Sequence, residues 1–198
     1  IHECLARGYP AKDAVIARKY IGSVKNLQLL TTKPIVYICN VEEKSIKNGN
    51  NFSESVNKMA KNKNSKCIIL SASIESEISQ ISSAEEKQLF LNDLGVNQSG
   101  LHQIINSGYD LLQLITFFTS GPKETRAWTI KEGTNAINAA GKIHTDFQKG
   151  FIRAETISYN ELSSIGNFIE AKDNGKLRSE GKEYIVKDGD IMNFRFNV

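Results

Sequence analysis

Two short apolar segments constrain the fold of this chain more than any other feature. Residues 35–39 and 66–70 are nearly unbroken runs of apolar side chains, without the alternation of a half-exposed strand. Runs of this length and type are typical of strands that are buried on both faces of a parallel sheet. Residues 52–63, which lie between them, place apolar side chains at helical spacing. The order strand, helix, strand therefore predicts a βαβ unit with parallel strands.

Further helices are expected on both sides of this unit. Residues 11–30 carry apolar side chains at helical spacing, and the proline that follows should end that helix. Ser83 and Ser99 stand at N-cap positions before predicted helices over residues 84–94 and 101–114.

The pattern changes after about residue 115. We expect a β-hairpin over residues 115–130 with its turn at residues 120–122, then a short helix over residues 135–140 that Gly141 closes. Later strands are expected at residues 151–157, 184–187 and 191–196, with a turn at residues 188–190. Four or five strands crossed by one helix form a β-grasp arrangement. The predicted fold class is thus α/β, a parallel αβ segment followed by a β-grasp domain.

Composition excludes several classes of protein. The chain is 40% hydrophobic and 24% charged with a net charge of +3, so an RNA contact would have to come from a local basic patch. Its three cysteines form no CxxC pair, which predicts reduced thiols and a cytoplasmic protein. No apolar run reaches the roughly 20 residues that span a bilayer, and no secretory signal precedes the first helix. The start at Ile1, without an initiator methionine, predicts a cut upstream in a longer protein.

Polar side chains follow each of the two buried strands, at the edge where open α/β sheets bind ligands. Asn40, Val41 and Glu43 follow the first strand, and the residues Ser71, Ala72 and Ser73 follow the second. An amide can bond a purine ring nitrogen, a carboxylate can accept from an exocyclic amine, and small residues let the backbone approach the base. GTP-binding proteins place Asn-Lys-x-Asp here, so the valine and the glutamate weaken the case for guanine. The alternative is that Asn40 starts a turn beside solvated glutamates.

A phosphate site and catalytic groups are not predicted. A P-loop needs G-x-x-x-x-G-K-[ST], and the Gly-Lys pairs at residues 141, 175 and 181 lack both the earlier glycine and the following hydroxyl residue. The three histidines are far apart and none forms an i,i+4 pair, so a metal site is not expected. An enzyme with an unfamiliar site is therefore the least favoured interpretation.

A basic cluster in the second half is a candidate RNA-binding surface. It consists of Lys142, His144, Lys149 and Arg153, around two glycines and Phe147. Cations can contact phosphates, and His144 with Phe147 could stack on an exposed base. By residue type alone the opposite interpretation is favoured, in which His144 hydrogen-bonds within the domain and Phe147 fills its core.

Several longer stretches of this sequence resemble the YchF-type Obg-like ATPases. They are residues 29–43, 90–95, 125–130, 139–147, 149–155 (KGFIRAE) and 188–198 (DGDIMNFRFNV). The last two are specific to that family, and the resemblance extends from about residue 20 to the end of the chain.

The resemblance implies a division into three parts. Residues 1–30 would be a helix that returns from a helical insertion, residues 31–114 the second part of a P-loop ATPase domain, and residues 115–198 a TGS domain. It also implies that Asn40, Val41 and Glu43 select ATP rather than GTP, and that residues 71–73 form the second base-facing loop.

The resemblance further implies partners and cofactors. The whole protein would use ATP with Mg²⁺ and associate with ribosomes or RNA through its TGS domain. The P-loop and switches would lie before Ile1, so we expect this chain to be inactive alone, to pair with the missing ATPase segment, and to self-associate through unpaired strand edges. The competing hypothesis is a β-grasp module that binds a protein and no nucleic acid.

Overall fold

The chain folds into two compact units. The computed structural model describes residues 1–121 and 124–197, apart from the side chains of Arg18 and Lys25. Unit 1 comprises Ile1–Gly108 and unit 2 comprises Tyr109–Val198, so the boundary falls inside helix α6 (Gly100–Leu112). Both contain helices and strands, as the α/β prediction requires. No helix in the described ranges has the length and apolar character needed to cross a membrane.

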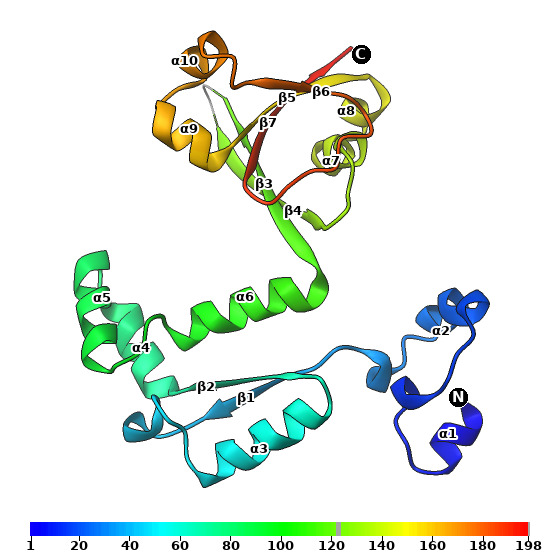
Figure 1. Cartoon of the computed structure of the whole chain (residues 1–198), viewed down its shortest axis with the longest axis vertical. Helices are drawn as coiled ribbons and strands as arrows, with labels where there is room; N and C mark the ends of the chain where they lie inside the picture. The colour runs from blue at the N-terminus through cyan, green and yellow to red at the C-terminus, as the bar shows by residue number, and fades with distance from the viewer. Residues whose placement is uncertain (122–123, 198) are drawn as a thin grey trace. The chain divides into compact units, whose positions relative to one another are not determined.

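Unit 1 contains the predicted βαβ unit. Strand β1 (Val36–Asn40) pairs in parallel with β2 (Lys66–Leu70), and Asn40 is opposite Leu70. Helix α3 (Asn51–Asn62) connects them and lies on one side of the two strands, whereas α6 lies on the other (Figure 1). The helix begins where Asn50 Oδ1 accepts hydrogen bonds from the first backbone N–H groups, which have no partner within the helix.

Three more helices complete the packed part of unit 1. They are α4 (Ala72–Gln80), α5 (Ala84–Asp93) and α6, and a small cluster around Ile74, Ile78 and Leu91 joins the first two. The structure confirms the predicted helices near residues 84–94 and 101–114. Helix α4 was not predicted because it is short and rich in serine, a residue with modest helix propensity.

The predicted continuous helix over residues 11–30 is wrong. That region contains the 3₁₀ turns η1 (Ala11–Asp13) and η2 (Arg18–Tyr20), helix α2 (Ile21–Asn26) and η3 (Leu30–Thr32), after a first helix α1 (His2–Ala6). Its apolar side chains have the right spacing, but Val15, Leu27 and Leu30 are exposed. A helix gains most of its stability in a protein from packing its apolar face against other residues. The exposed apolar side chains of this segment have helical spacing but do not pack in this way.

Unit 2 is built around a five-stranded mixed sheet. The strands are β3 (Leu114–Ser120), β4 (Thr125–Lys131), β5 (Phe151–Ser158), β6 (Arg178–Glu180) and β7 (Asp190–Phe196). Their order is β4-β3-β7-β5-β6, with β3 and β7 parallel and the other neighbours antiparallel. With a helix between the second and third strands along the chain, this is the predicted β-grasp arrangement. Of the predicted hairpin turn, Pro122 lies outside the described residues.

Two of the strand predictions for unit 2 need correction. Residues 184–187 form no strand and make one isolated bridge, between Asn135 and Ile185. The edge strand β6 instead occupies residues 178–180, a polar segment without a strand-like pattern. Its backbone pairs with β5, whose partner residues are 22 to 26 positions earlier in the sequence, and such pairing leaves no local signature.

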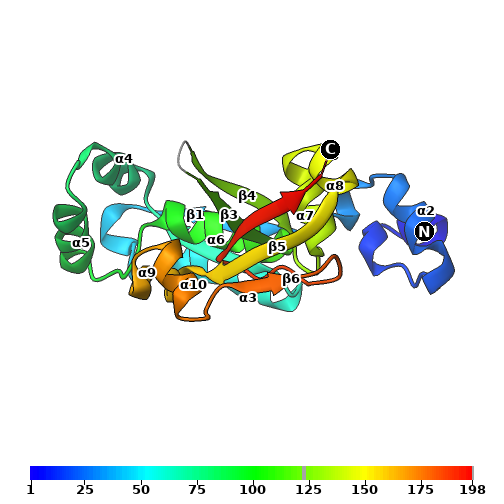
Figure 2. The ribbon, with the colours of Figure 1, turned by 90° about the horizontal axis from the view of Figure 1, so that it is seen from above.

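Helices cover both faces of this sheet, as Figures 1 and 2 show for unit 2. On one face α7 (Ala136–Ile143) and α8 (Thr145–Lys149) pack over a core that includes Phe117, Phe151 and Phe194. On the other, α9 (Tyr159–Ile165) and α10 (Phe168–Asp173) pack over Ile157 and Ile191. The prediction of a single short helix is therefore wrong.

Gly141 does not close α7 as predicted but lies within it. A Cβ atom at this position would come within 2.8 Å of the Gln148 side chain. The absence of a side chain therefore lets α8 pack closely against α7.

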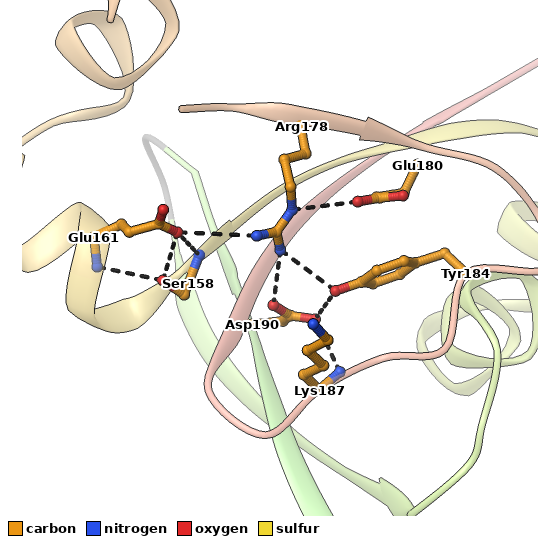
Figure 3. A network of polar contacts seen from close by, with 7 residues as sticks. All are labelled: Ser158, Glu161, Arg178, Glu180, Tyr184, Lys187 and Asp190. Atoms are coloured by element: carbon orange, nitrogen blue, oxygen red, sulfur yellow. Dashed lines mark hydrogen bonds and ion pairs between the residues drawn. The ribbon is translucent and has the colours of Figure 1, made fainter. Parts of the chain in front are cut away.

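A buried carboxylate fixes the loop between β6 and β7 (Figure 3). Asp190, with 2% of its surface exposed, accepts hydrogen bonds from the Tyr184 hydroxyl at 2.8 Å, from Lys187 N at 2.9 Å and from the Arg178 guanidinium at 3.4 Å. Burial, followed by the hydrogen bond to Asp190, raises the pKa of Tyr184 to about 12. These contacts explain why residues 184–187 take an irregular path and not that of a strand.

Candidate functional site

The carboxyl ends of β1 and β2 bring the two predicted base-binding loops together. Because the strands are parallel and Asn40 is opposite Leu70, both loops leave the sheet at the same edge. The Asn40 side chain joins them, since its Oδ1 accepts a hydrogen bond from Ala72 N at 3.0 Å. Val41 N donates to the Leu70 carbonyl at 2.8 Å and extends the contact by one residue.

The residues of the first loop differ in what they can offer a ligand. Val41 is only 8% exposed and its N–H is already bonded, so it provides an apolar wall and no donor. The neighbouring Glu42 is 3.4 Å from Lys44 in an ion pair. Glu43 begins a 3₁₀ turn, η4 (Glu43–Ser45), and its exposed side chain has no partner among the residues that the structure describes. Glu43 is therefore the free carboxylate of this loop.

The second loop presents fewer side chains than the sequence suggested. Ser71 is 1% exposed, its Oγ is 2.9 Å from Ser73 Oγ, and its carbonyl accepts from Glu75 N in the first turn of α4. Ala72 and Ser73 are exposed. Only these last two residues of the loop are placed to contact a ligand, and Ser71 is placed to support them from below.

The role of Glu75 was not predicted. Its carboxylate accepts hydrogen bonds from the backbone N–H groups of Gly100 and Leu101, at 2.6 and 3.2 Å. These are donors at the start of α6, so Glu75 ties the helix after the second loop to α6. The only available signal was an acidic residue shortly after the second buried strand, in a segment where no helix was expected.

An open hollow lies beside the first loop. It has a volume of about 570 Å³ and is lined by Glu42, Glu43, Lys44, Ile46, Lys47, Asn48, Asp93 and Leu94. Glu43 is the one predicted base residue in this lining, and Asn40, Ala72 and Ser73 do not take part. The hollow therefore does not unite the predicted base-binding residues.

The predicted RNA-binding residues lie on two different faces of unit 2. Lys142 is in the last turn of α7, and His144 and Lys149 begin and end α8. Arg153 is on β5, one residue before Ala154, which is buried against α7. Because side chains alternate along a strand, Arg153 points to the opposite face of the sheet. The structure thus brings three of the four residues together and separates the fourth.

His144 and Phe147 both have structural partners. His144 is the N-cap of α8, where Nδ1 accepts from Asp146 N at 3.2 Å, and its side chain remains 61% exposed. The Phe147 ring stacks on Phe196 with 3.9 Å between centroids. Phe147 therefore fills the edge of the core, and His144 combines a capping role with an accessible ring.

Arg153 belongs to a charged cluster that the sequence did not reveal. Glu155 accepts hydrogen bonds from Arg195 at 2.9 and 3.2 Å and from Arg153 at 3.1 Å. The Arg195 hydrogen bond, opposed by partial burial, lowers the pKa of Glu155. Arg195 and Glu155 also line a hollow of about 560 Å³, together with Lys172 and Asn193. Alternation along β7 was the only signal that could have placed Arg195 beside Arg153.

Metal ligands are not gathered anywhere in the described part of the chain. No group of three or more His, Cys, Asp or Glu side chains there has an arrangement that could hold a metal ion.

Comparison with known proteins identifies relatives of the whole chain. Residues 114–197 match the family model YchF-GTPase_C, described as "Protein of unknown function (DUF933)". The "Ribosome-binding ATPase YchF" of Bacillus subtilis (strain 168) is 47% identical over 191 residues, which cover 96% of this chain and 52% of that protein. The protein of the same name from Escherichia coli O157:H7 is 47% identical over 177 residues, 89% of this chain and 48% of that protein. The chain spans about half the length of the curated relatives it matches.

Solved structures agree with these matches. The Schizosaccharomyces pombe YchF GTPase superposes with a TM-score of 0.82 at 31% identity, over 96% of this chain and 50% of that one. A GTP-binding protein from Pyrococcus horikoshii OT3, at 18% identity and a TM-score of 0.59, shares the fold. Because both sequence and structure match over nearly its entire length, the chain belongs to the YchF family.

Proposed function

We propose that this chain contributes the base-reading loops and the ribosome-binding domain of a ribosome-associated ATPase. Relatives that are 47% identical carry the name ribosome-binding ATPase, which supports the proposal. In this proposal residues 1–30 are the segment that leads the chain back from a helical insertion into the ATPase domain. Residues 31–114 belong to that domain, and residues 115–198 form a TGS domain. A ribosomal partner would place the protein in the cytoplasm.

The hydrogen bond from Ala72 N to Asn40 Oδ1 carries the base-reading part of the proposal. Because Oδ1 is occupied, the amide NH₂ group of Asn40 is the end left to donate to a ring nitrogen of adenine. The free carboxylate of Glu43 can accept from the exocyclic amine, and Val41 supplies an apolar wall. Ala72 and Ser73 let the backbone approach the other edge of the base, with Ser71 beneath them.

ATP and Mg²⁺ would be bound only in part by these residues. The sequence contains no P-loop motif, so the chain's own residues are proposed to hold the base and not the phosphates or the metal. Among the residues that the structure describes, β1 and β2 pair with each other and with no further strand, so each keeps an edge at which another strand could add. We propose that such an edge pairs with a strand from the remaining ATPase segment, or with a second copy of the chain in its absence.

Nucleoside binding tests the base site. In nuclear magnetic resonance titrations we expect adenosine to shift the Asn40 side-chain amide and the Ala72 backbone amide more than guanosine does. Asn40→Ala should abolish the shifts, whereas Asn48→Ala, a change in the exposed loop that follows, should leave them unchanged. Equal shifts with both nucleosides, or none, would contradict the proposal.

Co-sedimentation with ribosomes at increasing salt concentration tests the proposed ribosome-binding role of unit 2. Phosphate contacts make affinity fall steeply with salt concentration, whereas an apolar protein interface does not. The proposed contacts are Lys142, His144 and Lys149 on α7 and α8, and Arg153 on the other face. We expect Lys142→Glu with Lys149→Glu to weaken binding, with Lys58→Glu, on exposed α3, as the control. Binding that salt does not change would favour the β-grasp domain as a protein-binding module.

A further inference from the structure

Two cysteine thiols lie next to each other on the paired strands of unit 1. The Sγ atoms of Cys39 on β1 and Cys67 on β2 are 3.6 Å apart. In the strand register Cys39 is opposite Ile69 and Cys67 is opposite Tyr37, so the cysteines are diagonal neighbours on the same face of the pair. Both are free and partly exposed. A small oxidant can therefore reach a pair of sulfur atoms that are already in contact.

The environment gives the two thiols different roles. Burial, followed by the hydrogen bond with Cys39, raises the pKa of Cys67 to about 11. Cys67 therefore keeps its proton at neutral pH and is a poor first nucleophile, because the thiolate is the reactive form. The raised pKa of Cys67 favours Cys39 as the thiol that is oxidised first, and the 3.6 Å separation places Cys67 to react with the product.

We propose that Cys39 and Cys67 form a reversible disulfide when the protein meets hydrogen peroxide. The Cys39 sulfur attacks a peroxide oxygen, the O–O bond breaks, and a sulfenic acid and one water form. The Cys67 sulfur then attacks the sulfenic sulfur, the S–O bond breaks, and a second water leaves with the Cys67 proton. Two thiols are oxidised to one disulfide, and one peroxide is reduced to two waters.

The position of the pair connects this chemistry to the loops. The sulfurs must move from 3.6 Å to the bonded distance of about 2.05 Å, which draws the end of β1 along β2. Asn40 directly follows Cys39, so the same movement displaces its Oδ1 from Ala72 N. This consequence for ligand binding rests on the proposed function, whereas the disulfide itself does not.

Mass spectrometry of the 198-residue chain tests the disulfide. After peroxide treatment we expect a monomer lighter by two hydrogen atoms, with the number of free thiols reduced from three to one and restored by dithiothreitol. Protease digestion should give one linked peptide that contains Cys39 and Cys67. Cys4→Ser is the matched control, because Cys4 lies on α1, where its Sγ contacts the Pro10 carbonyl, and this variant should still lose two hydrogens.

The single variants separate the disulfide from other oxidation. Cys39→Ser and Cys67→Ser should each prevent the mass loss, and Cys39→Ala and Cys67→Ala repeat the test without a hydroxyl group in the site. Addition of oxygen without loss of hydrogen, or a bond that uses Cys4 or a second chain, would overturn the proposal.

Amide hydrogen exchange separates this inference from the proposed function. Formation of the disulfide should speed exchange at Ala72, and unchanged exchange in the oxidised chain would refute the link between the thiols and the loops. If the disulfide forms but neither redox state binds adenosine, the base site fails and the disulfide stands. If adenosine binds and no disulfide forms, the base site stands and this inference fails.

Discussion

Unit 2 buries many of its apolar residues in one large cluster between sheet and helices, whereas the buried cluster between α4 and α5 of unit 1 is small. The main cluster of unit 2 contains ten buried residues, among them Phe117, Ala139 and Phe194, and the α4–α5 cluster of unit 1 contains three. Unit 1 also exposes large apolar side chains, with Phe52 82% and Leu30 78% exposed. Since apolar burial is the dominant favourable term in folding, unit 2 should be the more stable of the two.

The difference also separates two kinds of polar site. The buried carboxylate of unit 2, Asp190, has its hydrogen bonds satisfied within the protein and stabilises a loop. In unit 1 the exposed Asn40 and Glu43 stand at the ends of a two-stranded sheet, and sheets of two strands are marginal on their own. The proposed base-binding residues are thus on the weaker unit, where local opening costs less free energy.

The largest expected effect is a cavity in the core of unit 2. Phe117 is completely buried and meets Phe194 edge to face at 6.1 Å. Phe117→Ala should lower the free energy of unfolding of unit 2 by about 3–5 kcal/mol, because it removes apolar contacts and leaves a void. Hydrogen exchange resolved by residue should show the loss in residues 109–197 and little change in unit 1. Phe52→Ala, at an exposed site, is the control, and a loss shared equally by both units would show that they unfold together.

A smaller loss is expected when the carboxylate of Asp190 is removed. Asp190→Asn keeps the shape of the side chain but loses the charge that accepts from Tyr184, Arg178 and Lys187 N. Because Arg178 is partly exposed, we expect a loss of about 2–3 kcal/mol in unit 2, measured by urea unfolding. The pKa of Tyr184, which burial and the Asp190 hydrogen bond raise to about 12, should also fall, because the substitution removes the Asp190 charge; absorbance measures it. Asp173→Asn, an exposed change on α10, should alter neither quantity.

Methyl groups placed at two glycines of α6 should have opposite effects on the stability of unit 1. A Cβ at Gly100 would overlap Leu70 Cβ and crowd the Glu75 carboxylate, whereas one at Gly108 meets nothing within 4 Å. We expect Gly100→Ala to destabilise unit 1 by about 1–3 kcal/mol through overpacking. Gly108→Ala should instead stabilise α6 by up to about 1 kcal/mol. Thermal unfolding followed by circular dichroism measures both, and equal effects would contradict the close contact at Gly100.

The smallest expected effect is a pH dependence in unit 2. The pKa of Glu155 is lowered in the folded state from 4.5, chiefly by the hydrogen bond from Arg195. A lowered folded pKa means that the contribution to stability is present above pH 4.5 and disappears as the pH falls through the folded value. Glu155→Gln should remove this part of the acid sensitivity, at most about 1 kcal/mol because the pair lies at the surface. The midpoints of urea unfolding between pH 3 and 7 measure this contribution, with Glu124→Gln as an exposed control. Identical pH profiles for Glu155→Gln and the unmodified chain would refute the prediction.

Much of the fold follows from patterns that act within about ten residues. The strand character of the two apolar runs, the Ser83 and Ser99 caps and the hairpin of β3 and β4 depend on neighbours in the sequence, and these predictions were confirmed. The expected burial of β1 on both faces was wrong, since Ile38 is 50% exposed. The meeting of the two loops also follows, because parallel strands bring their carboxyl ends to one edge.

Other features depended on partners far away in the sequence. The segment 11–30 has helical spacing, yet its exposed side chains found no surface to pack against. The polar segment 178–180 became a strand because β5 offered it an edge, and the apolar segment 184–187 did not.

The sequence by itself thus determined the two apolar strands, the helix caps and the polar residues that follow the strands, because those properties belong to local backbone and side-chain chemistry. Only the tertiary structure decided that Ser71 is buried, that Arg153 faces away from Lys142, and that the sulfurs of Cys39 and Cys67 are in contact. The physical reason is that burial and side-chain contact depend on which distant segments pack together, and the apolar attraction that drives packing has no direction of its own.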